Sequence, residues 1–334
     1  MPDESDRPDR ARAVTLALAG DTMLGRGVAE ALAAERPMAL FAPEVVAAAR
    51  EADLFVLNLE CCISARGEPW PDPRKPFFFR APPVAAEALA ELGVDCVTLA
   101  NNHALDFGAE ALLDTREHLR DAGIAAVGAG GNLAEARAPM LLEANGFRLA
   151  VIGVTDHPSD YAAGKGSPGV AFAPLGPDLP DWLVRAVEHA RAQSDAVLVT
   201  PHWGPNMATR PLPRIRSAAD RLLAVGASVV AGHSAHVFHG VAGSVLYDLG
   251  DFVDDYAVDP VLRNDLGLLF LLTLDCSGPV RLEALPLALD YCHTRVAGGE
   301  DIGWIERRFR AACAALGSAV TSERGRLVIQ WPGR

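Results

Sequence analysis

Short apolar runs alternate with longer amphipathic stretches along most of the chain. Six runs are short and often β-branched, as buried strands are: 14–19, 54–59, 96–100, 149–154, 196–200 and 228–231. Five stretches between them repeat apolar residues at helical spacing: 42–52, 83–92, 109–122, 183–193 and 215–225. Gly93, Gly123 and Gly226 follow three of these stretches, where the end of a helix favours a left-handed residue. The alternation predicts an α/β fold with a largely parallel core.

The last part of the chain has a different pattern. The apolar runs at 245–249, 268–274 and 280–287 follow one another without helical stretches between them. Such a succession predicts antiparallel strands. We expect a final helix over 303–316 and a terminal strand over 327–331.

The composition excludes several classes of protein. Half of the 334 residues are hydrophobic and 22% are charged, which rules out a disordered chain. The formal net charge of -13 disfavours non-specific binding to nucleic-acid phosphates. Six cysteines without a CxxC pair exclude a small disulfide scaffold and fit reduced thiols.

The first residues bear on localisation. Residues 1–13 are polar and charged, and we predict that they form a disordered tail. A secretory signal would need a basic start followed by roughly 7–15 apolar residues, and this sequence has none. No apolar run approaches the roughly 20 residues that span a bilayer. We therefore expect a cytoplasmic protein without a membrane anchor.

Polar residues that suit a metal ion gather where the predicted strands end. Five strand ends carry such residues: Asp21; Glu60; Asn101, Asn102 and His103; His202; and His233 with His236. In an open α/β sheet, ligands bind in the crevice beyond the carboxyl ends of the strands. Imidazole, carboxylate and amide oxygen together suit zinc, manganese or iron ions. The pattern predicts a metal site at this edge.

Each of these residues alone also has an ordinary explanation. Asp21 fits a helix N-cap, Glu60 a solvated side chain, and Asn101 a turn. Five ordinary explanations at once are improbable, so we interpret the strand ends as one site. The remaining histidines lack this setting: His118, His157 and His189, with His239 nearer the cluster.

Two further kinds of chemistry have weaker signals. Cys61 and Cys62 directly follow Glu60, but buried structural cysteine is a better interpretation than a thiolate nucleophile. The glycines at 128–131 follow a predicted strand, yet they lack a full nucleotide-binding fingerprint, and no GxSxG motif is present.

Read in order, these motifs resemble those of the CapA-like family, which is named for capsule and poly-γ-glutamate biosynthesis. That family belongs to the calcineurin-like metallophosphoesterase superfamily. The matching segments are GDTMLGR at 20–26, NLE at 58–60, LANNHALDFG at 99–108, VGAG at 127–130, HWG at 202–204, GHSAH at 232–236 and YDLGDF at 247–252. The resemblance spans roughly residues 14–290.

The resemblance implies a fold and a set of roles. The fold is an α/β sandwich of the αββα type, with two mixed β-sheets flanked by helices. Asp21 would hold one metal, Glu60 would bridge, and His236 would support the first site. The second metal would be held by Asn102, His202 and His233, while His103 would contact the substrate anion or protonate a leaving group. Because the motifs must meet at one site, we predict a single domain over 14–334 with an antiparallel portion at about 244–334.

The sequence departs from the family pattern in three places. The superfamily's opening DxH is Asp21-Thr22-Met23 here, GHHPH is GHSAH, and HWGxEY is HWGPNM at 202–207. We therefore expect one or two divalent metal ions, whether Mn, Zn, Fe, Mg or Ca.

Three functions are compatible with these features. The first is a metal-dependent hydrolase of a phosphoester or related anion, with Arg26, Arg80 and Trp203 as substrate-binding candidates. The second is a metal-dependent peptide epimerase, a reaction reported for some CapA-like proteins, in which Asp21 and either His103 or His293 would exchange a Cα proton. The third is a non-catalytic accessory protein of polyglutamate or capsule polymer synthesis. The expected partner is an anionic small molecule or peptide.

Overall fold

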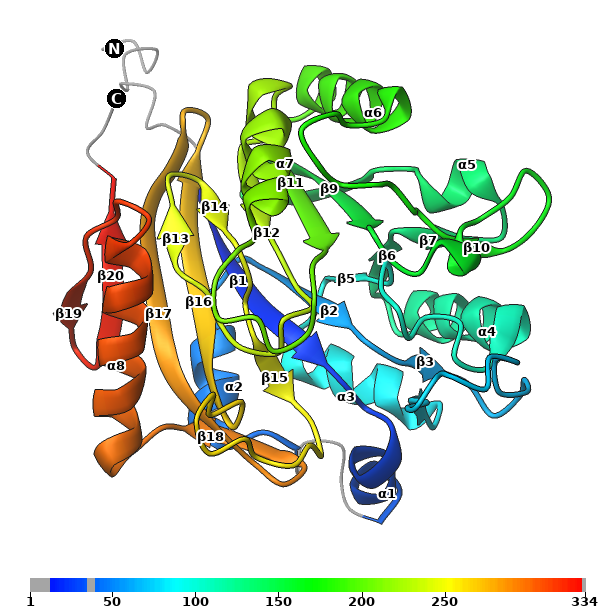
Figure 1. Cartoon of the computed structure of the whole chain (residues 1–334), viewed down its shortest axis with the longest axis horizontal. Coiled ribbons are helices and arrows are strands. Elements are labelled where there is room, and N and C mark those ends of the chain that lie inside the picture. Colours follow the sequence, from blue (N-terminus) through cyan, green and yellow to red (C-terminus); the bar gives the residue numbers. More distant parts are fainter. Residues whose placement is uncertain (1–12, 35–39, 332–334) are drawn as a thin grey trace, which may run out of the picture.

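Two β-sheets stack face to face in the computed structural model, which describes residues 13–34 and 40–331 (Figure 1). The first sheet has the strand order β19 (Thr321–Glu323), β20 (Arg326–Gln330), β17 (Gly278–Asp290), β16 (Leu266–Asp275), β1 (Ala13–Thr22), β2 (Leu54–Leu59), β5 (Cys96–Thr98) and β6 (Ala125–Val127). On this sheet β15 (Asp251–Val253) also pairs with β1, and β18 (His293–Val296) with β17. The second sheet has the order β13 (Val241–Ala242), β14 (Val245–Leu246), β12 (Val229–Ala231), β11 (Ala196–His202), β9 (Phe147–Thr155) and β8 (Met140–Ala144).

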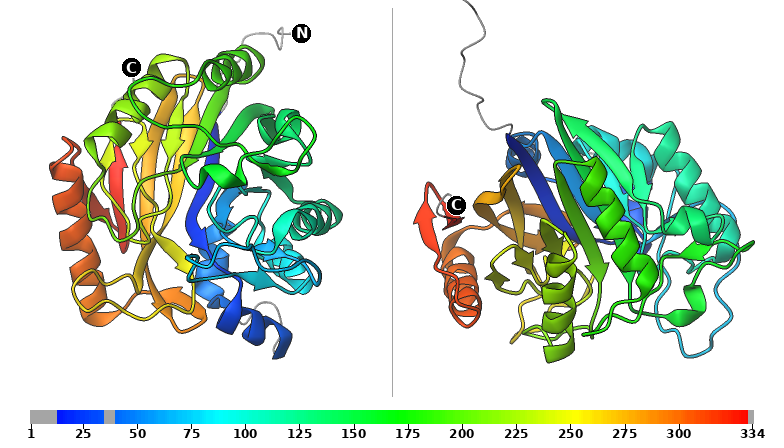
Figure 2. Two further views of the ribbon diagram at one scale, coloured as in Figure 1. Left: turned by 45° about the vertical axis from the view of Figure 1, so that its right-hand side comes forward. Right: turned by 90° about the horizontal axis from the view of Figure 1, so that it is seen from above.

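Helices cover the two outer faces. The first sheet is covered by α1 (Arg26–Ala34), α2 (Pro43–Ala49), α3 (Val84–Leu92) and α4 (Gly108–Asp121). The second sheet is covered by α6 (Asp181–Gln193) and α7 (Pro213–Ala224). The last helix, α8 (Gly299–Ala314), packs against β13, β16 and β17 at the side of the molecule opposite α4 (Figures 1 and 2). The smaller elements are α5 (Leu133–Ala136), η2 (Ser159–Tyr161) and the strand pairs β3 (Cys62–Ile63) with β4 (Arg80–Ala81) and β7 (Ala129–Gly130) with β10 (Gly169–Val170).

The side chains along each strand alternate between the outer helices and the space between the two sheets, which explains how the layers form. In β2, Phe55 and Leu57 pack with the helices on the outer face, while Leu54 and Val56 pack between the two sheets. Successive side chains of a strand point to opposite faces, so a strand buried on both faces has a continuous apolar sequence. The predicted αββα sandwich of two mixed sheets flanked by helices is confirmed.

The parallel and antiparallel parts lie where the sequence predicts them, with one correction. Strands β1, β2, β5 and β6 are parallel, whereas β16, β17 and β20 continue the same sheet with antiparallel pairing. The run at 245–249, predicted as antiparallel, is only the two-residue strand β14, and it pairs in parallel with β12. Its antiparallel partner is the equally short β13. The run ends early because the chain then crosses to the first sheet, where β15 pairs in parallel with β1.

Two sequence predictions concern the chain's start and its relation to membranes. The predicted tail at 1–13 lies outside the described residues except for Ala13, which begins β1. Among the helices of the described ranges, none is both long and apolar enough to cross a bilayer.

The segment at 245–253, which crosses from the second sheet to the first, contacts β1 where Gly250 lies against Gly20. The backbone N–H of Asp21 donates to the carbonyl oxygen of Gly250 at 2.8 Å, and Asp21 is in register with Asp251. A Cβ atom on Gly20 would lie 1.8 Å from that same carbonyl oxygen. Only glycine at position 20 lets the turn lie this close to β1, so this contact sets the position of both aspartates.

Replacing Gly20 with alanine tests this close approach. Because the added Cβ meets backbone that cannot rotate away, we expect Gly20→Ala to lower the free energy of unfolding by about 3 kcal/mol or more, as measured by urea denaturation. Gly176→Ala is the matched control, since nothing lies within 4 Å of a Cβ there. It should change the free energy of unfolding by less than about 1 kcal/mol. Equal stability of the two variants would contradict the packing described for β1.

Candidate metal centre

The carboxyl ends of strands from both sheets converge on one buried cluster of carboxylates and imidazoles. The first sheet contributes Asp21 from β1, Glu60 after β2, His103 after β5 and Asp251 from β15; the second contributes His202 from β11 and His233 and His236 after β12. An isolated parallel bridge joins His202 to His233. All seven side chains are buried, and Asp21 and Glu60 are fully removed from solvent. The structure therefore brings together residues that lie far apart in the sequence.

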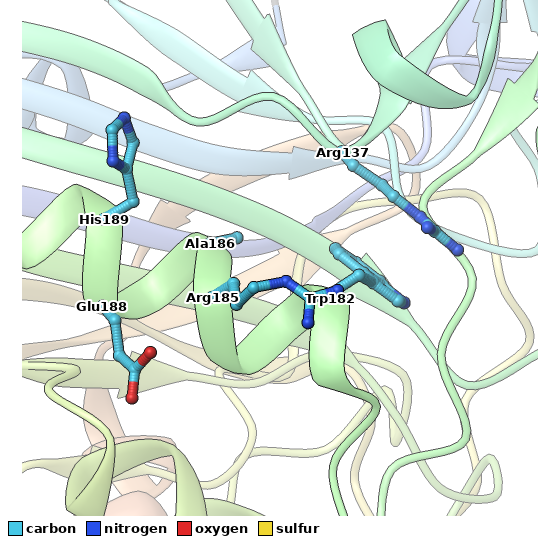
Figure 3. A pocket seen from close by; sticks show the side chains of 6 residues that line it. All are labelled: Arg137, Trp182, Arg185, Ala186, Glu188 and His189. Atoms are coloured by element: carbon cyan, nitrogen blue, oxygen red, sulfur yellow. The ribbon is translucent and has the colours of Figure 1, made fainter.

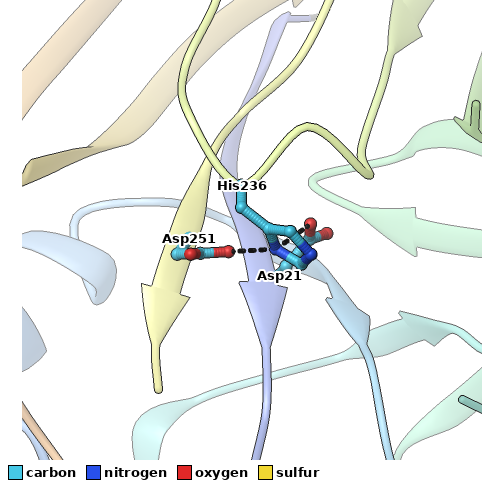
Figure 4. Close-up of side chains that lie close together, drawn as sticks. All are labelled: Asp21, His236 and Asp251. Atoms are coloured by element: carbon cyan, nitrogen blue, oxygen red, sulfur yellow. Dashed lines mark hydrogen bonds and ion pairs between the residues drawn. The ribbon is translucent and has the colours of Figure 1, made fainter. Parts of the chain in front are cut away.

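Asp21 is the centre of the first group. The Nδ1 atom of His236 lies 3.4 Å from Asp21 Oδ2 and 2.8 Å from Asp251 Oδ1, so its imidazole stands between the two carboxylates (Figure 4). On the other carboxylate oxygen, His233 Nδ1 lies 3.4 Å from Asp21 Oδ1. One ligand atom from each of Asp21, His236 and Asp251 lies within 4.8 Å of the others, a spacing that a single metal ion can span.

Asp21 also belongs to a second group, with Glu60 and His202. Glu60 Oε1 lies 3.9 Å from His103 Nε2 and 4.0 Å from His202 Nε2. The side-chain amide of Asn58 donates to Asp21 Oδ1 at 2.7 Å and to Glu60 Oε2 at 3.1 Å. This amide fixes the two carboxylates side by side, so that Asp21 is shared by two neighbouring groups of ligand atoms.

Several buried polar atoms of the cluster have no hydrogen-bond partner among the described residues. They are Glu60 Oε1, Asp251 Oδ2, His233 Nδ1, Asn102 Oδ1 and Asp254 Oδ2. Buried polar groups are normally paired, and an unpaired one calls for an explanation such as an ion. Over residues 13–34 and 40–331, no Lys or Arg forms an ion pair with Asp21, Glu60 or Asp251. Oxygen and imidazole donors of this kind fit divalent zinc, manganese or iron.

The pKa shifts of the cluster residues are those expected of a site that lacks a positive charge. Burial raises the pKa of Glu60 well above its ordinary value, and the neighbouring Asp21 charge raises it further. Burial and the charge of Asp254 likewise raise the pKa of Asp251. Burial opposes the ionisation of Asp21 too, yet the close approach of His233 and the charges of His236 and His202 hold its pKa below the ordinary value. Burial lowers the pKa of His202, which keeps its imidazole neutral, as a ligand must be.

His103 is held at the edge of the cluster by a chain of polar contacts. Its Nδ1 lies 2.7 Å from Asp106 Oδ2, and Lys75 Nζ lies 2.8 Å from Asp106 Oδ1. The backbone N–H of Phe79 donates to Asp106 Oδ2 at 2.6 Å. These contacts fix the ring so that Nε2 faces Glu60. Burial lowers the pKa of His103, although Asp106 opposes the shift.

Asn102 and Arg26 lie next to residues of the cluster. Asn102 is half-buried beside His103, and its backbone carbonyl accepts from Lys75 Nζ at 2.9 Å. Arg26 forms an ion pair with Asp255, and its guanidinium lies over the rings of Phe79 and Tyr256 at 5.3 and 5.8 Å. These rings in turn contact His103 and His236. Arg26 therefore reaches the cluster only through aromatic neighbours.

Three other predicted residues make contacts away from the cluster. The guanidinium of Arg80 lies 4.1 Å from the ring centroid of Phe107. Trp203 is buried among the helices on the second sheet, and its indole N–H donates to the carbonyl of Tyr247 at 2.9 Å. His293 is on β18, paired with Asp290 of β17. The predicted roles of these three residues remain hypotheses.

Sequence reasoning assigned no role to four residues around the cluster. Asn58 and Asp251 lie in the matched motifs, but Asn in a strand and Asp in a turn have ordinary explanations. Asp248 supports the loop of the histidines by accepting the backbone N–H of Ala235 at 2.9 Å. The ring centroid of His157 lies 5.2 Å from that of His202. His157 follows the end of β9, so the strand-end rule used for the other histidines would have found it.

The neighbouring cysteines do not carry a reactive thiolate. Burial raises the pKa of the Cys61 thiol well above its ordinary value and that of Cys62 to about 12. The thiolate is the nucleophilic form, and these environments suppress it. Buried structural cysteine is the interpretation that the structure supports.

An open cavity of about 680 Å³ on the outer surface of α6 contains none of the cluster residues. The guanidinium of Arg137 lies 4.3 Å from the ring centroid of Trp182 there, and Arg185, Glu188 and His189 complete the wall (Figure 3). The cavity belongs to a surface helix and does not reach the strand ends, so the carboxylate–histidine cluster is the candidate site.

Comparison with known proteins identifies the family. Residues 15–256 match the sequence profile of the bacterial capsule synthesis protein PGA_cap. The chain belongs to this family. The CapA-like resemblance of its motifs is thereby confirmed, and the PGA_cap family lies in the metallophosphoesterase-like superfamily.

Three relatives illustrate the similarity. A probable polyglutamine synthesis accessory protein of Mycobacterium tuberculosis is 33% identical over 294 residues, which cover 83% of this chain and 76% of that protein. The capsule biosynthesis protein CapA of Bacillus anthracis is 33% identical over 175 residues, 51% of this chain and 42% of that protein. The PGA biosynthesis protein CapA of Bacillus subtilis is 31% identical over 177 residues, 51% of this chain and 45% of that protein.

The raised pKa of Glu60 makes a prediction for this PGA_cap protein in the presence of a chelator. A carboxyl whose pKa is raised by folding stabilises the protein below its unfolded pKa, and that stability is lost as the pH rises. The unfolding free energy of the wild type, relative to Glu60→Gln, should therefore fall as the pH rises above the ordinary pKa of a glutamate. Chemical denaturation at several pH values measures it.

A control and a rescue complete this test. Glu143→Gln, at an exposed position on β8, should show no pH-dependent difference from the wild type. Adding Mn²⁺ should remove the loss in the wild type, because a cation replaces the proton on Glu60. If the unfolding free energies of the wild type and of Glu60→Gln changed with pH in parallel without metal, folding would not raise the pKa of Glu60.

Proposed function

We propose that this protein is a metal-dependent hydrolase that acts on a phosphoester or a related anionic substrate. The observation that carries the proposal is that Asp21 is shared by two groups of ligand atoms, one with His236 and Asp251 and one with Glu60 and His202. Divalent cations bound there would supply Lewis acidity toward an anionic oxygen and lower the pKa of water. The unpartnered Glu60 Oε1 and Asp251 Oδ2 support this reading.

The residues of the site would have separate roles as metal ligands and as positioning residues. Asp21, His236 and Asp251 would hold one ion, and Asp21, Glu60 and His202 the other. His233 Nδ1 and Asn102 Oδ1 are buried without a hydrogen-bond partner in the described residues, so they are available as further donors. Asn58 would keep Asp21 and Glu60 at fixed separation through its amide.

His103 is the residue that we propose protonates the leaving group. As an imidazolium it donates its Nδ1–H to Asp106 and carries its other proton on Nε2, the atom that faces Glu60. Burial lowers the pKa of this imidazole, so the proton on Nε2 is released readily. Lys75 and the Phe79 N–H hold Asp106 in place and thereby fix the ring.

Arg26 is the better placed of the predicted arginines for binding the anion. Its side chain is 37% exposed and rests on Phe79 and Tyr256, the rings that border His103 and His236. Asp255 Oδ2 accepts from its Nε, and its Nη2 lies 2.9 Å from Asp255 Oδ1, which leaves the donors on Nη1 for a substrate oxygen.

A second candidate rests on the names of the relatives. The Mycobacterium tuberculosis relative is described as a probable polyglutamine synthesis accessory protein, and two others as CapA proteins of capsule or PGA biosynthesis. These names favour an accessory role in the synthesis of an anionic polymer. Such a role is compatible with hydrolysis and is also possible without it. The epimerase alternative would use Asp21 with His103 or His293, and His293 lies on β18 in register with Asp290 of β17.

Removal of the His202 imidazole tests the hydrolase. With Mn²⁺ present, we expect the wild type to hydrolyse p-nitrophenyl phosphate, and His202→Ala to lower kcat/KM by about 100-fold or more because a ligand is lost. Metal analysis of the purified proteins should show less metal per chain in the variant. His189→Ala, on the surface of α6, is the control and should retain both properties. A wild type that binds no metal, or turnover that is equal in the two variants, would contradict the proposal.

The leaving group tests the role assigned to His103. p-Nitrophenolate leaves without much help, whereas an alkyl alcohol needs a proton, so Asp106→Asn should lower kcat far more for an alkyl phosphate than for the aryl ester. We expect about 100-fold for the alkyl ester. His103→Gln should give the same dependence, and the double variant should add little, because the two residues act as a unit. Equal losses on both substrates would show that the pair only supports the fold.

A further inference from the structure

A second cavity, of about 640 Å³, adjoins the metal centre. Its walls come from three segments: His157, which follows β9; Pro205, which follows β11; and Arg214, in the first turn of α7. Leu175 and Leu212 complete an apolar wall. Because β11 ends at the centre and β9 ends beside it, this cavity lies next to the strand ends that carry the centre.

The buried carboxylate of Asp156 holds His157 in place in the cavity wall. The Asp156 side chain is 5% exposed, and its Oδ1 lies 2.5 Å from His157 Nδ1. Its Oδ2 accepts from Arg214 at 2.6 Å and from the backbone N–H of Gly204 at 3.4 Å. One aspartate thus orients both the imidazole and the guanidinium. Two side chains fixed in this way lose little conformational freedom when a ligand binds.

Both side chains keep free hydrogen-bonding atoms. His157 uses Nδ1 for Asp156, and its Nε2 has no hydrogen-bond partner among the described residues. Arg214 uses one terminal nitrogen for Asp156 and for the carbonyl of Leu175, which leaves the donors on its other nitrogens. The side chains are 32% and 45% exposed, so solvent and ligand can reach them.

The cavity is also in contact with the centre. The ring of His157 lies 5.2 Å from that of His202, which is itself 1% exposed. His157 therefore lies between His202 and the cavity that it lines with Arg214. The apolar wall of Leu175, Pro205 and Leu212 suits a hydrocarbon segment between two polar ends.

We propose that His157 and Arg214 form a second anion-binding subsite, which takes a carboxylate or phosphate at the far end of an extended substrate. This inference rests on the proposed function, because the near end of the substrate is the anion at the metal centre. Arg214 binds such an oxyanion through paired N–H donors, and His157 adds a donor at Nε2. The predicted substrate class is a two-headed anion, that is, a molecule with an anionic group at each end of an apolar spacer.

Non-hydrolysable phosphonates test the subsite by calorimetry on the Mn²⁺-loaded protein. Propylphosphonate probes the centre alone, while ω-phosphonocarboxylates and alkylene-bisphosphonates with two to six methylenes probe both ends. The best two-headed ligand should bind at least about tenfold more tightly than propylphosphonate, because its second end binds intramolecularly. Comparison of the carboxylate and phosphonate series shows which oxyanion the subsite takes.

Variants assign the effect to the named residues. Arg214→Gln and His157→Gln should remove the tenfold advantage while leaving propylphosphonate binding and the manganese content unchanged. Arg185→Gln, on the exposed face of α6, should keep the advantage. Thermal melting verifies that each variant is folded.

The outcomes separate this inference from the proposed function. If propylphosphonate binds but no two-headed ligand binds more tightly, the subsite is wrong and the hydrolase proposal stands. If the glutamine variants weaken propylphosphonate as much as the two-headed ligands, the residues serve the centre and the subsite is wrong. If the Mn²⁺-loaded wild type binds no phosphonate at all, the proposed function fails and this inference fails with it.

Discussion

Asp21 lies where the end of β1 meets the turn that carries Asp251, and its carboxylate contacts groups from both sheets. Asp21 and Glu60 are removed from water together, at the centre of a molecule in which burial alone would favour neutral carboxyls. An uncompensated buried charge is costly, by about 3–5 kcal/mol when a partner is removed from a buried pair. Histidines, one amide and a few backbone N–H groups offset only part of this cost. The unpartnered oxygens of Glu60 and Asp251 mark the place where positive charge is still required.

The fold provides this arrangement through backbone packing. Gly20 lets β1 lie in direct contact with the Gly250 carbonyl of the crossing segment, so Asp21 and Asp251 come into register. Asn58, on the next strand, then holds Asp21 beside Glu60. The second sheet presents His202 and His233 from adjacent strand ends, joined by their own bridge. The site is therefore a property of how two sheets meet, and each sheet supplies only part of it.

Much of this could be predicted from the sequence because the determining signals are local. Buried strands of the parallel core have continuous apolar runs, and polar residues at their ends mark the sheet edge, so Asp21, Glu60 and His202 could be found without a structure. The crossing at 245–253 could not, because strands of two or three residues have no periodicity and their aspartates resemble turn residues. Asp251 becomes a candidate metal ligand only because the fold places it beside Asp21, which is far away in the sequence.

Residues that are adjacent in sequence can lie on opposite sides of a sheet. Trp203 follows His202, but successive side chains of an extended segment point to opposite faces, and the indole lies among the helices of the outer layer. His157 shows the converse. It is distant in sequence from every histidine of the cluster, yet β9, over Leu149 to Thr155, pairs in register with β11, and the two strands end side by side. Its place after a strand end can be predicted from the sequence, whereas the pairing of β9 with β11, which places its ring against His202, cannot.

Anomalous X-ray scattering from crystals grown with Mn²⁺ would show whether Asp21 is shared between two cations, as we propose. We expect two anomalous peaks, both in contact with the Asp21 carboxylate, one also in contact with His236 and Asp251 and the other with Glu60 and His202. Fully ordered Asp21, Glu60 and Asp251 side chains without any anomalous peak beside them, at saturating Mn²⁺ and neutral pH, would contradict it.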